Sequence, residues 1–337
     1  MRSVFVLGLA AAAAAASSML GAQTPMTRLE AVSSPSPIDK TTQTEDVAFQ
    51  TEKYDRMTVP VIVSGTGPYR FLVDTGADRT AISRDIATNL RLEVGLRASL
   101  HSVAGVSKVA TATVPSLQLT RKPVRIVDAP LLERVNMGAD GILGVDSLRS
   151  QRVMFDFEAQ TMSIVPAAVP DFRDEQGTIV VTASRRNGRL VVTEARANNR
   201  PLTVVLDTGA QISIGNDALR RRLEADNSIE AERQVELDSV TGQKLVGDIV
   251  LVRELKIGGV TMTNLAVVFA PAHTFKQLRL ENRPAMLLGM NAIRAFKKVS
   301  IDFANRKLKV VMPEQSEDDF RLATPTVSHE AGSIGRR

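Results

Sequence analysis

The sequence predicts an all-β protein of two similar lobes, and three observations lead to this prediction. Short runs rich in Val, Ile and Thr recur along the chain, bounded by Gly, Asn and Pro, which is typical of strands. Helical spacing is confined to brief stretches such as 83–92 and 216–225, which begin at a capping Ser or Asn. The third observation is an internal repeat, because the same landmarks occur in the same order in both halves.

Four landmarks carry the repeat: an Asp-Thr-Gly-Ala motif, a Ser-Val-x-Gly motif, an apolar pair followed by Gly, and a closing pair of strands that contains an Asp. They stand at 74–77 and 207–210, 102–105 and 239–242, 142–144 and 287–289, and 153–165 and 299–311. The spacing grows slowly, from 133 residues at the first Asp (207 − 74) to 146 at the last (302 − 156). This series indicates duplication with short insertions, so we expect two lobes related by a pseudo-twofold axis.

The repeat also sets the domain boundaries. Two blocks, 51–165 and 179–312, hold the strand patterns, and a polar, Pro-containing linker at 166–178 joins them. Residues 23–50 are rich in Ser, Thr, Pro and Gln without apolar periodicity, so we expect a disordered leader or linker. We expect residues 313–337 to form a flexible tail for the same reason.

The first 22 residues have the pattern of a secretory signal peptide. Arg2 precedes an apolar run at 4–16, and small residues follow. We expect cleavage after this segment and a periplasmic or secreted protein. The alternative is an uncleaved anchor, for which the run is marginal in length, and only in that case would the chain associate with a membrane.

Composition excludes several classes of protein. Net charge is +5 (42 − 37) with scattered basic residues, aromatic residues are 4% and Trp is absent, so we expect no nucleic-acid partner. The absence of Cys excludes thiol catalysis, thiolate metal sites and disulfides. The three His residues have no paired metal-binding spacing, and we expect neither a metal nor another cofactor.

The repeated Asp-Thr-Gly turn offers the most specific chemistry. In each copy an apolar run places an Asp, Asp74 or Asp207, at the end of a buried strand. One such turn would be ordinary turn chemistry, but a pseudo-twofold axis would bring the two carboxylates face to face. Carboxylates about 3 Å apart share one proton, so one can accept a proton from water while the other donates to a substrate carbonyl. This arrangement predicts hydrolysis by general acid–base catalysis without a covalent intermediate.

The motifs resemble those of the pepsin and retropepsin superfamily of aspartic proteases. LVDTGADRT (72–80) is similar to the retroviral signature, VLDTGAQISIG (205–215) is similar to both types, and the two apolar-apolar-Gly tripeptides match the second motif of the superfamily. The resemblance covers most of both blocks and implies an acid protease fold with few short helices. It also implies a bacterial, exported endopeptidase that binds extended polypeptides and is a monomer with an internal pseudo-dimer.

The resemblance implies a role for each residue of the two loops. Asp74 and Asp207 would be the catalytic pair, Thr75 and Thr208 would exchange hydrogen bonds between the loops, and Gly76 and Gly209 would present backbone N–H groups to the carboxylates. Flap hairpins that close over substrate would carry Val103, Ala104, Gly105, Val240, Thr241 and Gly242. The two glycines would lie near the flap tips, where tight turns need them.

The sequence departs from the pepsin pattern at two places. Ala77 and Ala210 stand where pepsins usually carry a Ser or Thr that donates to the outer carboxylate oxygen. Losing those donors makes the pair less acidic, so we expect a mildly acidic optimum. Neither flap segment carries the Tyr usual in pepsin flaps.

Other Asp residues receive structural interpretations. Asp78 stands where retropepsins often place an acid that pairs with Arg, and Arg79 or a more distant Arg could serve. Asp156 and Asp302 repeat like the catalytic pair, but we expect them to fix a turn or to contact an Arg. We expect Asp140 and Asp146, which flank the Ile-Leu-Gly strand, to be turn residues.

Three functions remain in competition. The first is an aspartic endopeptidase for limited processing or quality control in the cell envelope. The second is a catalytically inactive peptide-binding or scaffold protein with the same fold, which the two intact Asp residues disfavour. The third is a zymogen in which 23–50 covers the cleft, although that segment lacks the basic character of pepsin-type propeptides.

Overall fold

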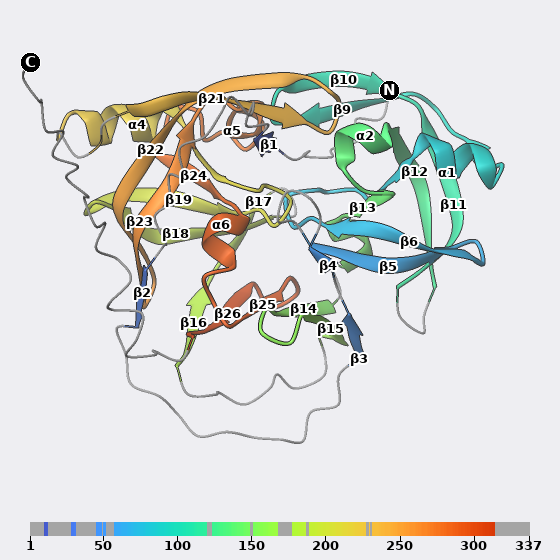
Figure 1. The fold of residues 1–337 in the computed structure, drawn as a ribbon, viewed down its shortest axis with the longest axis horizontal. Coiled ribbons are helices and arrows are strands. Elements are labelled where there is room, and N and C mark those ends of the chain that lie inside the picture. Colours follow the sequence, from blue (N-terminus) through green and yellow to red (C-terminus); the bar gives the residue numbers. More distant parts are fainter. Residues whose placement is uncertain are drawn as a thin grey trace, which may run out of the picture.

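The structure is a computed structural model that describes residues 10–12, 28–31, 45–48, 50–51, 57–119, 123–148, 151–167, 177–186, 189–226, 229 and 231–313. Figure 1 shows two lobes side by side, the first coloured blue to green and the second yellow to orange, with a further sheet below both. The described elements are mostly strands, with six short helices. The predicted all-β, two-lobed fold is confirmed.

An eight-stranded sheet forms the N-terminal lobe. In spatial order its strands are β4 (Gln50–Thr51), β5 (Met57–Val63), β6 (Thr66–Val73), β13 (Gly141–Leu143), β7 (Ala81–Ser83), β12 (Val124–Leu132), β11 (Thr111–Gln118) and β8 (Glu93–Val94). β5 also pairs with β11, which curls the sheet on itself. The remaining elements of this lobe are the hairpin β9 (Ala98–Ser102) and β10 (Gly105–Val109), and the helices α1 (Arg84–Asn89), α2 (Arg134–Met137) and α3 (Val145–Leu148).

A ten-stranded sheet forms the C-terminal lobe. Its main path is β1 (Ala10–Ala12), β21 (Ala231–Ser239), β22 (Lys244–Ile257), β18 (Arg189–Ala197), β19 (Arg200–Leu206), β24 (Ala285–Leu288), β20 (Ser213–Gly215), β23 (Val260–Phe269) and β2 (Arg28–Ala31). β17 (Ser184–Arg186) pairs with β18, and β22 also pairs with β23. The helices are α4 (Asp217–Glu224), α5 (His273–Gln277) and α6 (Met290–Ile293).

The helix starts repeat between the lobes. The two stretches predicted to be helical contain α1 and α4, which follow the capping residues Ser83 and Asn216. The side-chain oxygens of these caps accept hydrogen bonds from the backbone N–H groups of Ile86 (3.3 Å) and Leu219 (2.9 Å). A cap of this kind satisfies one of the free N–H groups of the first turn, which is why each helix begins there.

The closing strand pairs of the two repeats join into one sheet. Its six strands, in spatial order, are β16 (Thr178–Thr182), β26 (Lys307–Val311), β25 (Lys298–Asp302), β14 (Gln151–Asp156), β15 (Thr161–Pro166) and β3 (Glu45–Ala48). At its centre β14 from the first repeat pairs antiparallel with β25 from the second. The linkage between the lobes is therefore a continuous β-sheet as well as the chain itself.

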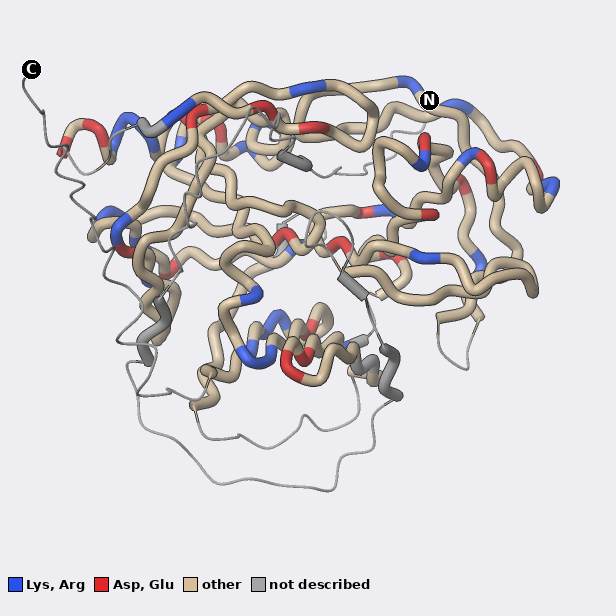
Figure 2. Tube along the Cα trace, in the orientation of Figure 1, with Lys and Arg blue, Asp and Glu red and all other residues tan. Residues whose placement is uncertain are grey.

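Two ion pairs cross the centre of this sheet, related by the same spacing of 146 as their strands. Arg152 lies opposite Asp302, with Nη2 3.1 Å from Oδ2, and Lys298 lies opposite Asp156, with Nζ 3.4 Å from Oδ2. Each Asp also accepts a turn hydrogen bond, from Ala159 N–H (2.8 Å) or Asn305 N–H (2.7 Å). Asp156 and Asp302 thus both fix turns and pair with cations, and Figure 2 shows the mixed charges gathered on this sheet.

Residues near the N-terminus add strands at sheet edges. β2 pairs with β23, and β3 pairs with β15, so parts of the segment expected to be a disordered leader are in strands. Ala10–Ala12, within the expected signal peptide, pair with β21. An edge strand carries unpaired N–H and C=O groups that attract such additions.

The linker interior and nearly all of the expected tail lie outside the described residues. In the part of the chain that the structure describes, no helix has the length and apolar character that a membrane span requires.

Candidate active site

Each of the two Asp-Thr-Gly loops begins where a buried strand ends. Phe71 to Val73 at the end of β6 are buried, and Asp74 follows them directly. β13 runs parallel to β6, and its Leu143 carbonyl accepts from Asp74 N–H at 3.0 Å. In the second lobe β24 runs parallel to β19, and the Leu288 carbonyl accepts from Asp207 N–H at 3.1 Å. In each lobe the strand with the apolar-apolar-Gly motif thus lies beside the Asp-Thr-Gly loop, and its carbonyl accepts a hydrogen bond from the backbone N–H of the Asp.

The two loops are tied to one another by reciprocal hydrogen bonds. Thr75 N–H donates to Thr208 Oγ1 at 3.0 Å, and Thr208 N–H donates to Thr75 Oγ1 at 3.1 Å. Each hydroxyl in turn donates across the axis, Thr75 to the Leu206 carbonyl at 3.2 Å and Thr208 to the Val73 carbonyl at 2.7 Å. All four bonds are buried, so the structure gives Thr75 and Thr208 the arrangement that the resemblance implies.

The glycines allow each loop to lie against the opposite carboxylate. A Cβ added to Gly76 would lie 2.5 Å from Oδ1 of Asp207, and one added to Gly209 would lie 2.3 Å from Cγ of Asp74. Each glycine N–H also donates to the carboxylate of its own loop, at 2.7 Å for Gly76 and 3.1 Å for Gly209. No side chain larger than hydrogen fits at either position without moving a carboxylate.

The two carboxyl groups are buried and close to each other. Asp74 is fully buried, Asp207 is 4% exposed, and each carboxyl lies against the glycine of the opposite loop. Oδ2 of Asp74 accepts no hydrogen bond from the described donors. The structure therefore brings Asp74 and Asp207 to one point between the lobes.

Burial is the main cause of the raised pKa values of the two carboxyls. Burial, followed by the charge of Asp207, raises the pKa of Asp74 well above its ordinary value. Burial also raises the pKa of Asp207, while the positive charge of Arg189 and the Gly209 N–H oppose that rise. Because both carboxyls are buried close together and both have raised pKa values, we expect the pair to hold one proton between them and to titrate as a unit.

Arg189, which sequence reasoning missed, is the cation beside the pair. It lies on β18 of the C-terminal lobe, is 1% exposed, and donates from Nε to the Gly76 carbonyl at 2.8 Å. Its Nη2 lies 3.3 Å from Oδ2 of Asp78, so Arg189 is the more distant Arg that was one of two candidates for this acid. Arg79, the other candidate, lies 4.0 Å from Asp146.

One sequence signal points to Arg189. Arg56 and Arg189 are 133 residues apart, the same spacing as Asp74 and Asp207. Arg56 lies outside the described residues.

Burial raises the pKa of Asp78 to about 6, with the charge of Arg189 opposing the rise and that of Asp146 adding to it.

Asp140 and Asp146 do more than close local turns, so that interpretation is incomplete. Asp140 accepts from the Arg70 N–H at 2.8 Å and pairs with Arg134 at 3.0 Å. Asp146 accepts from both the N–H and the hydroxyl of Thr80, at 2.8 and 2.7 Å. Both side chains thus tie the ends of the Ile-Leu-Gly strand to the first catalytic loop and its neighbouring strands, over sequence separations that local pattern does not reveal.

Both predicted flaps are hairpins, and their tips lie in the opposite lobes. Val103, at the β9–β10 turn, is 1% exposed and packs in an apolar cluster otherwise formed by C-terminal-lobe residues. Val240, at the β21–β22 turn, is fully buried in a cluster otherwise formed by N-terminal-lobe residues. Gly105 (φ +147°) and Gly242 (φ +77°) adopt left-handed backbone angles at the turns, which suits glycine.

The tips also contact one another. Thr241 Oγ1 lies 3.5 Å from Ser102 Oγ, and Ser107 donates to Gln243 at 3.4 Å. Ala104 lies in the turn between β9 and β10. The two hairpins predicted to be flaps, one from each repeat, thus contact each other, and the tip of each packs in the opposite lobe.

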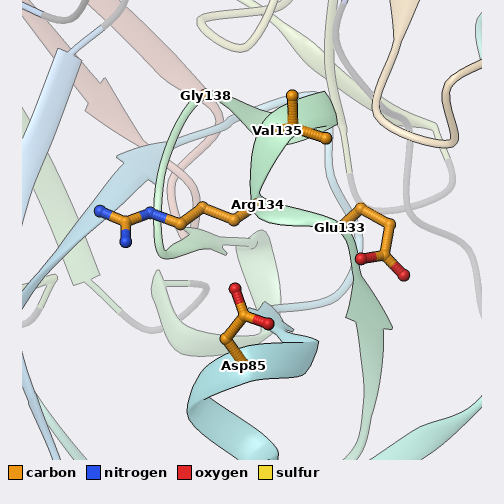
Figure 3. Close-up of a pocket in the computed structure, with 5 residues that line it drawn as sticks. All are labelled: Asp85, Glu133, Arg134, Val135 and Gly138. Atoms are coloured by element: carbon orange, nitrogen blue, oxygen red, sulfur yellow. The ribbon is translucent and has the colours of Figure 1, made fainter.

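A separate cavity of about 480 Å³ lies on the N-terminal lobe between α1 and α2 (Figure 3). Its lining residues are Asp85, Glu133, Arg134, Val135 and Gly138. Glu133 pairs with Arg84 and Arg134 pairs with Asp140, so these two charges are already matched. None of the expected site residues lines this cavity.

Comparison with known families identifies both halves of the chain. Residues 59–150 match the family described as gag-polyprotein putative aspartyl protease, and residues 193–292 match the family described as aspartyl protease. The first match contains Asp74 and the second contains Asp207. No curated protein matches the chain. The chain therefore belongs to the retropepsin-like aspartyl proteases, with one such domain in each half.

Proposed function

We propose that the chain is an aspartic endopeptidase that hydrolyses peptide bonds in extended polypeptides held between its lobes. The observation that carries this proposal is the buried, adjacent pair Asp74 and Asp207, on loops joined by the hydrogen bonds of Thr75 and Thr208. A pair with one proton and one charge is suited to acid–base hydrolysis. The two aspartyl protease families support the same reaction.

A pair with one proton and one charge supplies both roles of the reaction. The charged carboxylate accepts a proton from a water molecule as that water attacks the peptide carbonyl carbon. The protonated carboxyl donates its proton to the carbonyl oxygen, which gives a neutral tetrahedral diol. The first carboxyl then passes its new proton to the amide nitrogen while the second takes a hydroxyl proton back from the diol, so the C–N bond breaks, a carboxyl and an amine are released, and the pair regains one proton and one charge.

The flaps define how substrate enters. Val103 and Val240 are buried in opposite lobes, so both tips must leave these sites before a polypeptide can reach the carboxyls. After closure, hairpin strands above an extended chain can hydrogen-bond its backbone, with alternate side chains directed into pockets.

The proposed setting is the cell envelope of a bacterium. The signal-peptide pattern of residues 1–22 supports export to the periplasm or the medium. Two domains in one chain supply both carboxyls, which supports a monomer. With an ordinary composition and modest net charge, limited processing or quality-control proteolysis fits better than bulk digestion.

The test is digestion of an unfolded protein between pH 3 and pH 7 by the wild type, Asp74→Asn and Asp207→Asn. Each substitution keeps the side-chain shape and removes the acid–base function, so we expect cleavage to fall by about 10³-fold or more. Asp156→Asn is the matched control, because it removes a repeated Asp that fixes a turn, and we expect its activity to be unchanged.

Two outcomes would contradict the proposal. Either Asn variant retaining wild-type cleavage would remove the mechanism. A wild type that binds the unfolded protein at every pH without cleaving it, with or without pepstatin, would favour the inactive peptide-binding protein instead.

A further inference from the structure

Two of the three His residues of the sequence meet across the lobes. His101 lies on β9 of the N-terminal flap, and His273 begins α5 of the C-terminal lobe. Nδ1 of His101 is 2.9 Å from Nε2 of His273, and the rings are stacked with centroids 5.2 Å apart and planes inclined by 23°. Both rings are partly exposed, so solvent protons reach them.

This contact lies at the point where the flap tip docks. Val103, two residues after His101, inserts into the C-terminal-lobe cluster, and its carbonyl accepts from His273 N–H at 2.7 Å. The tip is therefore held by apolar packing, by this backbone hydrogen bond, by the contacts with the other flap and by the pair of rings. Among these contacts, only the pair of rings changes its charge within the ordinary pH range.

We propose that His101 and His273 form a latch that holds the N-terminal flap closed at neutral pH and releases it when both rings are protonated. A hydrogen bond between two ring nitrogens needs one donor and one acceptor, which a pair with at least one neutral ring provides. When both rings are charged, both facing nitrogens carry a hydrogen and the two cations repel one another. The regulatory meaning of this latch, control of access to the dyad, rests on the function proposed above.

The surrounding charges favour release in acid. Lys276, one turn further along α5, is a cation near His273, and Lys108, on the same face of the flap hairpin as His101, donates to Ser99 at 2.6 Å. Burial and then the charge of His273 lower the pKa of His101. Burial and then Lys276 lower the pKa of His273.

Because closure lowers the pKa values of both rings, acid weakens the closed state of the flap. An open flap frees the rings to bind protons with an ordinary His pKa of about 6.5, so the open state binds more protons than the closed one. The closed state is fully favoured above this pH and loses stability below it. Acid therefore opens the flap in the range where a carboxyl pair is active.

Among the residues that the structure describes, no pair of His rings lies at the tip of the second flap. Gly242 lies against the amide group of Asn136 on α2, 2.9 Å from the position of an added Cβ, and an amide does not titrate. The proposed acid response therefore starts at the N-terminal flap.

The test is hydrogen exchange of the flap segment 98–109 and of the His273 amide between pH 4.5 and pH 7.5, corrected for intrinsic exchange rates. The full chain with Asp74→Asn and Asp207→Asn prevents self-digestion and removes the titration of the dyad. We expect protection to fall as the pH drops, and His101→Gln and His273→Gln to lose this pH dependence. His329→Gln, which changes the third His, is the matched control and should respond as the parent does.

The outcomes separate a latch from a purely structural contact. Protection that does not change with pH in the parent would overturn the proposal. So would His101→Gln and His273→Gln variants that lose protection equally at every pH and keep the parent's slope. An NMR titration of the parent's His rings gives a second check, because both rings must gain protons over the range where protection falls. None of these readouts depends on proteolysis, so they stand apart from the test of the peptidase.

Discussion

In the N-terminal lobe the residue after Asp-Thr-Gly-Ala is Asp78, whereas the C-terminal lobe has Gln211 at the same position of the repeat. A second difference lies behind the loops. Asp146 accepts from the N–H and hydroxyl of Thr80 in the first lobe, and Asn291 accepts from the N–H and hydroxyl of Ser213 in the second, at 2.8 and 2.9 Å. At both positions an acid in the first lobe corresponds to an amide in the second.

These differences separate the features that the twofold geometry requires from those that can vary between the lobes. The Asp, Thr and Gly of each loop meet their counterparts across the axis, so a change in one lobe disturbs both. The supporting residues act within or beside one lobe, and either an acid or an amide supplies the oxygen that they need. The negative charge of Asp78 in the first lobe is paired with Arg189 from the second.

The largest effect should follow removal of that cation. Arg189→Met leaves Asp78 without its partner and frees the Gly76 carbonyl, and we expect a loss of about 3 kcal/mol in the free energy of unfolding at pH 8. The loss should be smaller at pH 5, because Asp78 then takes up a proton. Urea unfolding at both pH values measures this.

Arg79→Met is the matched control for Arg189. Arg79 is 39% exposed and 4.0 Å from Asp146, so its removal should change stability by less than about 1 kcal/mol. Equal losses for the two variants would show that the buried ion pair of Arg189 contributes no more to the free energy of unfolding than the exposed contact of Arg79.

The threonine exchange should give the next largest effect. Thr75→Val and Thr208→Val each remove one accepted and one donated hydrogen bond in the buried exchange, and we expect each variant to lose about 1–3 kcal/mol in the free energy of unfolding. We expect the larger loss for Thr208→Val, because its hydroxyl donates over 2.7 Å while that of Thr75 donates over 3.2 Å. Thermal unfolding with Thr→Ser variants as controls ranks the two, and the reverse order would contradict this comparison.

The two carboxyls should differ in how they affect stability with pH. The pKa of each is raised by folding, so the wild type loses stability as the pH rises above about 4, the range of an unfolded Asp. Asp74→Asn and Asp207→Asn remove part of this loss, and both variants should be more stable than the wild type at pH 8, Asp74→Asn the more so. A gain that does not shrink towards pH 4 would be inconsistent with this cause.

The smallest effect should come from converting one lobe to the chemistry of the other. Asp146→Asn keeps the oxygen that accepts from Thr80, as Asn291 does for Ser213, so stability at neutral pH should change by less than about 1 kcal/mol. Asp146→Ala removes the acceptor and should destabilise the protein more. Chemical denaturation compares the two, and equal losses would mean that charge, not the accepting oxygen, matters at this site.

Parts of the site were predictable from sequence because they repeat. Asp74 and Asp207, with the Thr and Gly that follow, stand in two copies with one spacing, and a duplicated turn implies a twofold axis. The flap segments at 102–105 and 239–242 were predictable for the same reason. The 133-residue spacing from Arg56 marks Arg189 as a repeated position, but it does not give the contact of Arg189 with Gly76, 113 residues away. The His101–His273 pair was not predictable, because the two residues lie 172 positions apart and no local pattern marks such a contact.

The fold divides in a similar way. Strand composition and the spacing of the closing strand pairs predicted the elements of each repeat. They did not predict that β14 and β25 join the two repeats in a single sheet, or that β2 and β3 add to sheet edges. A strand's sequence indicates that it pairs, but its partner is chosen by which edge lies within reach once the lobes are packed.

By itself the sequence determined the duplication, the β character of each copy and the identity of the two acids, because spacing and residue type are local properties. Tertiary structure alone decided that the two acids are buried close together, that an Arg from the second lobe lies beside them, and that each flap tip docks in the opposite lobe. The physical reason is that burial, charge proximity and packing arise only when residues far apart in the chain are brought into contact.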